Sequence, residues 1–334
     1  MQYLLNKRRK GEKKAASTLI FVPTALEKYQ IRAFLGLKVN LAFPTTNFLM
    51  QHFSVEQMTL ADLELAAEWG ASEGWNPGLH DAPIFYQTDP KGFFIGRIDG
   101  KPVATISAVR YGSDFGFIGF YIVAPEFRDH GYGGHLILHA SQHLAGCRSV
   151  GLDGVESQQS NYARHGARYA HDNIRFEGHG PGEKIHLPSR SEICSLIALP
   201  IETILDYDRR HFPADRSNFL EPWIHQPEAL ALGILRSGKL AGFGVRRRSH
   251  TGFRIGPLFA DDREAASELL SGLRQGMGSE EAFYVDVPAS NHHALSLAEH
   301  LGMRPAFHTA RMYLGEAPVL PVSEIYGITS LELG

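Results

Sequence analysis

The sequence of 334 residues has few of the features that mark secreted, membrane or metal-binding proteins. Its two cysteines, Cys147 and Cys194, are too few for a disulfide framework or a cysteine-rich zinc site, so we expect a cytoplasmic protein. No run of about 18 apolar residues occurs, which argues against a membrane-spanning helix. Charged residues make up 21% of the chain, too few for a disordered protein, and 43% hydrophobic residues provide material for packed cores.

Outside the N-terminal segment, acidic residues outnumber basic ones. Residues 1–50 contain nine Lys and Arg and two Glu, whereas the rest of the chain contains 24 Lys and Arg and 34 Asp and Glu. Such an acidic remainder disfavours binding to the phosphate backbone of a nucleic acid. The basic segment lacks a small-residue cleavage site for secretion, and regular patterning begins only near Met50. We therefore predict that residues 1–50 form an extension outside the fold.

After this extension the sequence alternates between helical and strand patterns. Residues 60–74 have apolar positions at helical spacing. Two β-rich runs flank an Asp99-Gly100 turn, which predicts a hairpin. Residues 115–123 are apolar on both faces, as in a buried central strand. The other elements predicted in this half are a helix from about residue 135, a strand at 149–155 and a short helix at 158–165.

The same order of patterns recurs in the second half. Gly238, in the turn of a second predicted hairpin, lies 138 residues after Gly100, and Gly302 lies 136 residues after Gly166. Two features that repeat at nearly one offset predict a duplicated domain. The elements predicted here after the hairpin are strands at 253–260 and 282–287 and helices at 262–275 and 291–301. The predicted domains are 51–178 and 192–334, joined by a Gly- and Pro-rich linker at 179–191.

One loop of the first half has the composition of a phosphate site. A buried strand ends at Val123, and Arg128 to Gly134 then form a glycine-rich turn that leads into a helix. Glycines let the backbone approach a ligand closely, free N–H groups at a helix N-terminus bind phosphate, and an arginine suits a diphosphate. The chain lacks both the P-loop motif and the G-x-G-x-x-G fingerprint. A glycine-rich turn without a ligand is the alternative interpretation.

The pattern R-x-x-G-x-G, here Arg128, Gly131 and Gly133 between a strand and a helix, resembles the GNAT acyltransferases. In that family the corresponding loop wraps the pyrophosphate of acetyl-CoA. The resemblance therefore implies acetyl-CoA as the cosubstrate. The residues that it assigns to acetyl-CoA binding are Ile122, Val123, Arg128, Asp129, His130, Gly131, Tyr132, Gly133 and Gly134.

The resemblance continues after the loop. In the family, a strand and a short helix follow and end on Tyr-x-x-x-Gly-Phe; here Tyr162 is followed by Gly166, with Ala167 where Phe is usual. The family's tyrosine protonates the departing thiolate, which implies a catalytic role for Tyr162. A phenol with a pKa near ~10 is protonated at neutral pH and can donate that proton. The alternative is a tyrosine of an amphipathic helix with its hydroxyl at the surface.

The resemblance implies an α+β (mixed α/β) fold with two tandem GNAT-like domains, each a mostly antiparallel mixed central sheet flanked by helices. The second half lacks the phosphate-binding features. Alignment of the repeats places Asp261 at the position of Arg128, and the position four before Gly302 is Ala298 rather than tyrosine. We predict that this half cannot bind acetyl-CoA, because carboxylates repel a diphosphate.

In the GNAT fold the loop between the first two helices lines the acceptor site, here within residues 72–86. Its carboxylates and aromatic rings suit an amine. The predicted substrate-binding residues are Trp75, Asn76, Asp81 and Tyr86. The strand at 115–123 carries no carboxylate, so this strand does not supply a general base. Glu73 is the candidate, Asp81 and Glu156 are alternatives, and deprotonation of the amine by solvent is also open. A loop with ordinary caps is the competing interpretation.

Three histidines, His135, His139 and His143, recur on one helix face, but no HExxH motif or acidic partner accompanies them, so we expect no metal. The sequence as a whole predicts an acetyl-CoA-dependent N-acetyltransferase that acts on a small amine, without nucleic-acid or membrane partners. An acyl-CoA-binding regulator without turnover is the alternative, and a longer acyl donor is also open. The sequence does not indicate an oligomeric state.

Overall fold

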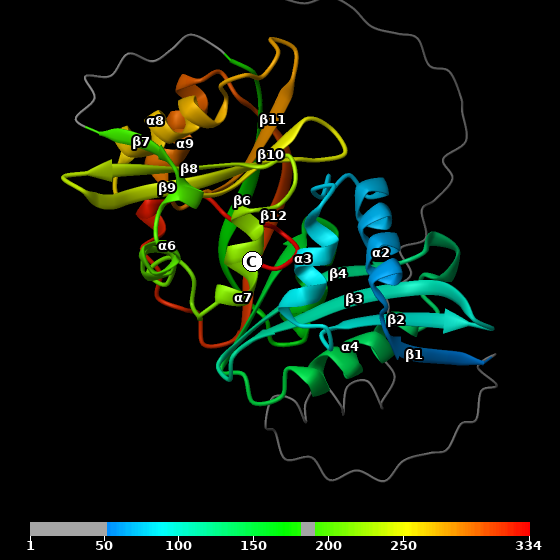
Figure 1. Cartoon of the computed structure of the whole chain (residues 1–334). Helices are drawn as coiled ribbons and strands as arrows, with labels where there is room; N and C mark the ends of the chain where they lie inside the picture. Colours follow the sequence, from blue (N-terminus) through cyan, green and yellow to red (C-terminus); the bar gives the residue numbers. More distant parts are fainter. Residues whose placement is uncertain (1–51, 182–190) are drawn as a thin grey trace, which may run out of the picture.

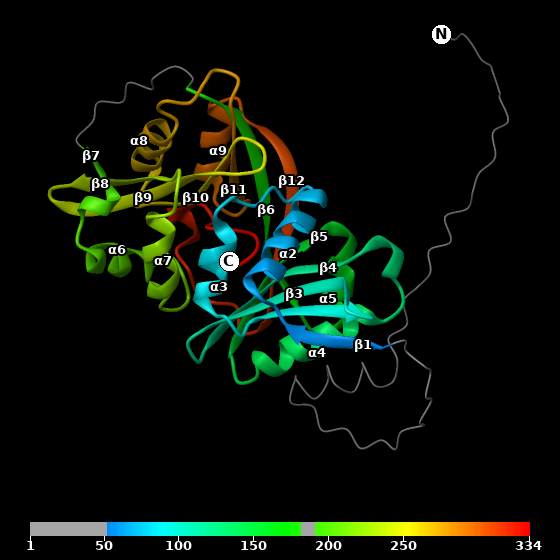
Figure 2. The same cartoon turned by 45° about the vertical axis from the view of Figure 1, so that its right-hand side comes forward.

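The computed structural model describes residues 52–181 and 191–334 (Figures 1 and 2). The predicted extension, and residues 182–190 of the predicted linker, lie outside these residues. In the first half the elements are β1 (Phe53–Gln57), α2 (Leu60–Ser72), α3 (Asp81–Thr88), β2 (Phe93–Ile98), β3 (Lys101–Tyr111), β4 (Phe115–Val123), η1 (Pro125–Phe127), α4 (Tyr132–His143), β5 (Ser149–Val155), α5 (Glu156–Arg164) and β6 (Arg168–His179).

The second half repeats this order. Its elements are β7 (Glu192–Ser195), η2 (Leu196–Ala198), α6 (Ile201–Asp208), α7 (Ser217–Ile224), β8 (Leu230–Arg236), β9 (Lys239–Arg248), β10 (Phe253–Ala260), α8 (Arg263–Leu273), β11 (Ala282–Pro288), α9 (His292–His300), β12 (Arg304–Gly315), η3 (Val322–Glu324) and β13 (Ile325–Gly327).

Local signals account for several element boundaries. Thr59 and Asp62 form a reciprocal capping box that starts α2. Both predicted hairpin turns have positive φ at their two central residues; the values are 49° at Asp99 and 78° at Gly100. The predicted strands β4, β5 and β10 have the expected bounds. The helix expected from about residue 135 begins three residues earlier, at Tyr132, directly after its N-cap Gly131.

The two halves share one continuous sheet, a feature that the sequence prediction of two domains did not include. Within the described residues the strands form one sheet, in the order β1-β2-β3-β4-β5-β12-β6-β11-β10-β9-β8-β7, with β13 beside β10. The strands β6 and β12 are exchanged between the halves: β12 lies between β5 and β6, and β6 lies between β11 and β12. Figure 1 shows this exchanged pair between the two halves. No pattern within either half predicts the exchange, because it joins strands more than 100 residues apart.

Two buried ion pairs cross the exchanged strands. Arg175 of β6 donates from Nε to Asp286 of β11 at 2.7 Å, and Arg311 of β12 donates from Nε to Asp153 of β5 at 2.8 Å. The four side chains are almost wholly buried. Breaking such a pair is costly, because the remaining charge stays buried without a partner. The two pairs therefore favour this register over a slipped one.

An apolar core also joins the halves. Phe85 of α3 stacks on Phe219 and Trp223 of α7, with ring centroids 6.5 Å and 5.9 Å apart. All three side chains are buried, and they belong to one cluster that includes residues of both halves. The two halves therefore share this cluster, whereas the buried residues of a second cluster, around Ile106 and Leu136, all belong to the first half.

The buried Asp286 carboxylate, which pairs across the exchanged strands, predicts that the fold loses stability in acid. Burial raises the pKa of Asp286, but Arg175 and Arg254 lower it more, to about 2. Since the unfolded value is ~3.9, the ionised carboxylate stabilises the fold by about 2–3 kcal/mol above about pH 4, and this stabilisation is lost as the pH falls toward 2. Urea unfolding should show that Asp286→Asn has a lower free energy of unfolding than the parent chain at pH 6. This difference should become smaller at pH 3. An Asp99→Asn control should match the parent, and a pH-independent deficit would contradict this account.

Candidate active site

A groove of about 770 Å³ opens on the first half. The end of β4, the following loop, the N-terminus of α4 and one face of α5 line it, and β12 of the second half contributes Phe307. All predicted cofactor-binding residues except His130 line the groove, namely Ile122, Val123, Arg128, Asp129, Gly131, Tyr132, Gly133 and Gly134. The structure thus brings together residues that the sequence placed in one loop.

The N-terminus of α4 differs from that of its counterpart α8. Gly131, the N-cap of α4, has a φ of 83° and no side-chain cap. In α8 the Asp262 carboxylate accepts a hydrogen bond from the Ala265 amide at 3.0 Å and so caps its own helix. A helix without such a cap leaves amide donors and its positive dipole end for an anion. The N-terminus of α4 therefore has no side-chain cap at the groove, whereas the N-terminus of α8 is capped by its own carboxylate.

A glycine is required where the groove meets β4. A Cβ atom at Gly133 would lie 2.2 Å from the Tyr121 hydroxyl oxygen, which is closer than any real contact. The backbone of α4 and the phenol of Tyr121 can therefore be this close only because position 133 has no side chain.

Arg128 and Glu73, predicted to act on different substrates, contact each other at the groove. Arg128 donates to the Glu73 carboxylate at 2.6 Å and to the Val123 carbonyl oxygen at 2.9 Å. Both side chains are partly exposed, at 47% and 39%, so the pair is only weakly stabilising and can exchange partners. His130 lies outside the groove lining: its Nδ1 is 2.7 Å from the Arg128 carbonyl oxygen. His130 is thus the one predicted acetyl-CoA-binding residue that does not line the groove, and its role in binding stays a prediction.

A second, inner cavity of about 60 Å³ adjoins the groove where β4 and β5 separate. The two strands pair in parallel from Phe115 to Ile118, and beyond that point their pairing stops. Phe120 has a φ of 44° at a register shift between β3 and β4, which is a local bulge. Tyr121 and Val155 line both cavities, so the groove and the inner cavity are neighbours.

Tyr162 lines the inner cavity from α5. Its ring packs on Gly154, where a Cβ atom would lie 3.0 Å from the ring. Burial raises the pKa of the Tyr162 phenol, and Tyr121 raises it further, so the hydroxyl stays protonated across the neutral range. This protonation state is the one that a proton donor needs.

Of the predicted acceptor residues, Trp75 lines both cavities and Glu73 lines the groove. The other three have different roles. Asp81 begins α3, is 1% exposed and pairs with Arg247, so the prediction that it binds substrate is wrong. Asn76 is hydrogen bonded to the loop between β9 and β10, and Tyr86 packs against the core beside Phe93; neither lines either cavity.

Sequence reasoning missed the contributions of distant segments. Phe307 and Thr309 of β12, and Leu331 near the end of the chain, line the inner cavity. Thr309 is 2% exposed, and its hydroxyl has no hydrogen-bond partner among the described residues. No local signal could have identified these residues, because the strand exchange brings Phe307 and Thr309 to the site and Leu331 reaches it from the segment after β13.

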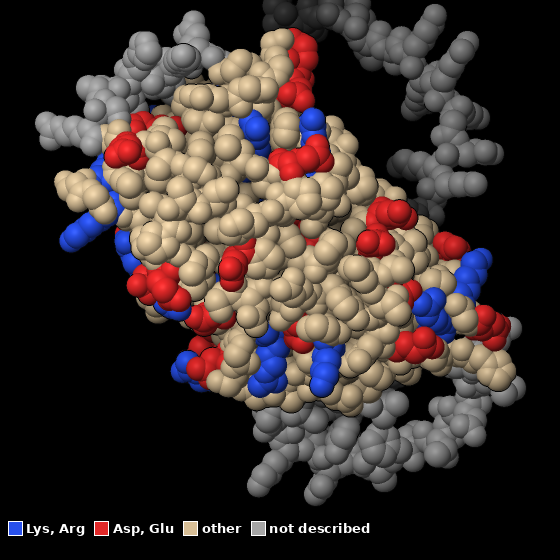
Figure 3. All heavy atoms as spheres, viewed as in Figure 1, with Lys and Arg blue, Asp and Glu red and all other residues tan. Residues whose placement is uncertain are grey.

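The described residues show neither a continuous basic surface on the face in view nor a group of metal ligands. Figure 3 shows Lys and Arg interspersed with Asp and Glu on the face in view, rather than a continuous basic surface. In residues 52–181 and 191–334, no three His, Cys, Asp or Glu side chains are grouped as metal ligands would be. His143 pairs with Asp89 at 2.7 Å. No helix in the described parts of the chain is long and apolar enough to cross a membrane.

Comparison with known proteins agrees with this geometry. Residues 58–167 match the Acetyltransferase (GNAT) family, and residues 204–327 match the Acetyltransferase (GNAT) domain. The chain is a tandem GNAT protein. The holothin acyltransferase of Pseudoalteromonas sp. (strain SANK 73390) is 29% identical over 285 residues, which cover 85% of this chain and 95% of that protein. The GNAT match and this relative assign the chain to the acyltransferases.

Two solved structures share the fold. A candidate acetyltransferase from Pyrococcus horikoshii superposes with a TM-score of 0.71 at 19% identity and covers 87% of this chain and 99% of its own. A tandem GNAT protein from the clavulanic acid biosynthesis pathway superposes with a TM-score of 0.58 at 14% identity and covers 80% and 100%. The predicted mixed α/β fold class, with two GNAT-like halves, is confirmed.

Proposed function

We propose that this tandem GNAT protein transfers an acetyl group from acetyl-CoA directly to a small amine, at a single site in the first half. The observation that carries the proposal is the uncapped N-terminus of α4, which lines a groove that adjoins the cavity of Tyr162. The counterpart in the second half is capped by Asp262. We assign the diphosphate to the amides of Gly131 to Gly134 and to Arg128, and we keep the cytoplasm as the expected location.

The proposed reaction needs two proton movements. The amine nitrogen forms a bond to the thioester carbonyl carbon, the carbon–sulfur bond breaks, and Tyr162 gives its proton to the departing thiolate. Glu73 accepts the proton that the amine loses, directly or through water. When the diphosphate engages Arg128, the Glu73 carboxylate loses its partner and becomes free to meet the amine. Tyr162 then regains a proton from solvent before the next turnover.

The acceptor is placed between Trp75 and Phe307, which line both cavities and come from different halves. Aromatic faces attract an ammonium group, and Glu73 adds a carboxylate nearby. Incubation of the full chain with acetyl-CoA and a panel of amines, with free thiol as the readout, tests the proposal. Holothin, the molecule in the relative's name, belongs in the panel. The proposal would be contradicted if no amine in the panel raised the release of free thiol above the background rate.

Arg128→Glu should raise the Kd for acetyl-CoA about tenfold or more. The substitution removes one charge-assisted contact of about 1.5–3 kcal/mol and adds a negative charge beside Glu73. Calorimetric titration measures the Kd. Arg148→Glu is the matched control, because Arg148 is an exposed arginine that pairs with Asp114 and does not line the groove. An unchanged Kd in Arg128→Glu would remove Arg128 from the site.

A further inference from the structure

We propose that the second half of the chain positions the acceptor loop of the first half, and that Arg254 is the positioning residue. The acceptor loop is defined here as residues 75–81. This inference rests on the proposed function, because it assigns the second half a role in binding the amine rather than acetyl-CoA. It also gives a reason for a domain that has lost its own anion site.

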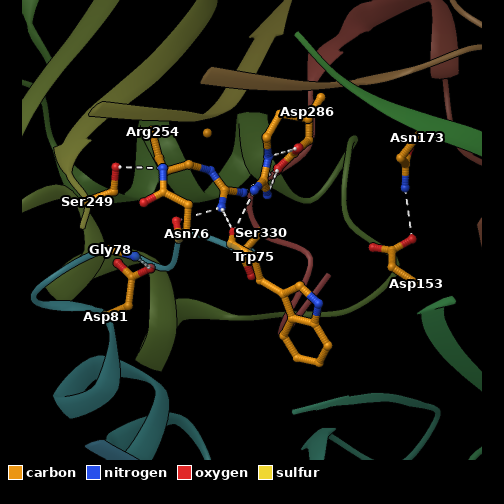
Figure 4. Close-up of polar contacts among 12 residues, drawn as sticks. Trp75, Asn76, Gly78, Asp81, Asp153, Asn173, Ser249, Arg254, Asp286 and Ser330 are labelled. Atoms are coloured by element: carbon orange, nitrogen blue, oxygen red, sulfur yellow. Dashed lines mark hydrogen bonds and ion pairs between the residues drawn. The ribbon is translucent and has the colours of Figure 1, made fainter. Parts of the chain in front are cut away.

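Two buried arginines hold the start of the acceptor loop by its backbone. Arg254 of β10 donates to the carbonyl oxygens of Trp75 and Asn76, at 3.1 Å each. Arg175 of β6 donates to the Trp75 carbonyl oxygen at 2.6 Å. Both guanidinium groups also bind the Asp286 carboxylate, which fixes their orientation. Figure 4 shows Arg254 and Asp286 at the backbone of the loop, with the Trp75 indole extending away from them.

The rest of the acceptor loop is bound to the second half as well. The Asn76 side chain donates to the Thr251 carbonyl oxygen at 3.0 Å and accepts from the Thr251 amide at 2.9 Å. The Leu79 amide donates to the Arg248 carbonyl oxygen at 3.0 Å. The loop therefore has contacts along its length with the strands β9 and β10 and with the turn between them.

The repeat within the chain shows that Arg254 is not needed to neutralise Asp286. Asp153 occupies the same place on β5 as Asp286 on β11, and it has one arginine partner from the exchanged strand, Arg311. The residue of β4 at the register position of Arg254 is Phe117, which lies under the Arg311 guanidinium at 5.0 Å. One half thus has an aromatic ring where the other has a second buried arginine. The additional arginine is the one that reaches the acceptor loop.

The contacts of Arg254 and Arg175 with the acceptor loop bear on the two aromatic residues that line the site, Trp75 and Phe307. Arg175 contacts the Trp75 carbonyl and also lies over the Phe307 ring, 5.4 Å from its centroid. Trp75 and Phe307 line both the groove and the inner cavity. The anion-binding loop, in contrast, is built from β4 and α4. Release of the acceptor loop should therefore impair use of the amine and leave acetyl-CoA affinity nearly unchanged.

The test uses full-length Arg254→Met, with Arg216→Met as the matched control. Arg216 is another buried arginine of the second half; it donates to Asp208 at 2.8 Å and 2.6 Å and to Thr329 at 2.9 Å rather than to the acceptor loop. Hydrogen–deuterium exchange of residues 75–81 should be about tenfold or more faster in Arg254→Met and unchanged in Arg216→Met. The kcat/KM for the best amine should fall about tenfold or more while the Kd for acetyl-CoA stays within about twofold. Arg254→Lys, which keeps one cationic donor, should restore part of the loss.

Asn76→Gly provides a second route if Arg254→Met does not fold. It removes the side-chain bonds to Thr251, and glycine accepts the φ of 52° found at this position. Faster exchange of the acceptor loop and a lower kcat/KM for the amine are again expected. Unchanged exchange in these variants, or equal losses in Arg216→Met, would overturn the inference. Absence of amine turnover in the parent chain would refute the proposed function, whereas the exchange result would still decide whether Arg254 holds the loop.

Discussion

Replacing Tyr162 with phenylalanine should lower kcat by about 100-fold or more, the usual effect of losing a general acid. The variant keeps the ring that packs on Gly154 and removes only the hydroxyl. Because the leaving thiolate would then take its proton from solvent, the chemical step slows while the Kd for acetyl-CoA stays within about twofold. Stopped assays of thiol release with saturating amine measure kcat, and calorimetry measures the Kd.

Tyr169→Phe is the matched control, since Tyr169 is 60% exposed on the adjoining strand and lines neither cavity. It should have the kcat of the parent chain. The raised pKa of Tyr162 adds a second expectation: its acid form persists through the neutral range, so kcat should not fall through ionisation of this phenol between pH 7 and about 9. A kcat within threefold of the parent in Tyr162→Phe would exclude Tyr162 as the acid.

Gly131→Asp should weaken acetyl-CoA binding by about 100-fold or more. The substitution imitates the second half, where Asp262 caps α8 and occupies an amide donor. A carboxylate at the N-cap of α4 would bind the same amides as the diphosphate and repel it, and the loss of two such contacts is about 3 kcal/mol. Titration with acetyl-CoA measures the change.

Gly131→Ala separates charge from backbone strain. Position 131 has a φ of 83°, which strains any side chain, and alanine tolerates this conformation no better than aspartate. The alanine variant should therefore be at least as destabilised in thermal unfolding but should retain most of its affinity for acetyl-CoA. Equal losses of affinity in the two variants would mean that the loop geometry, rather than an open anion site, determines binding.

The sequence predicted the parts of the site that lie close together along the chain. The strand end at Val123, the glycine-rich turn and the helix after it are local features, and the structure places them along one groove. Hairpins such as the one at Asp99-Gly100 were predictable for the same reason, because two residues at positive φ set the turn. Burial and periodicity within one segment determine these elements.

The rest depended on contacts between distant segments. The spacing of Asp81 and Asn76 in a polar loop gave no indication that Arg247 and the turn at residues 249–252 would bind them. Phe307 could not be assigned to the site, because its strand lies between two strands of the other half. A duplicated sequence predicts two similar folds. It does not indicate whether the last strands of the sheet, such as β12, pair within their own half or with the other half. The buried pairs Arg175–Asp286 and Arg311–Asp153 join neighbouring strands that the exchange brings together.

The number of acetyl-CoA molecules bound by each chain is the most direct test of the central claim, that only the first half retains the cosubstrate site. Calorimetric titration of the full-length protein should give one site per chain. That result follows from an uncapped α4 and from an α8 capped by Asp262. Two sites per chain, or no binding at all, would contradict the account.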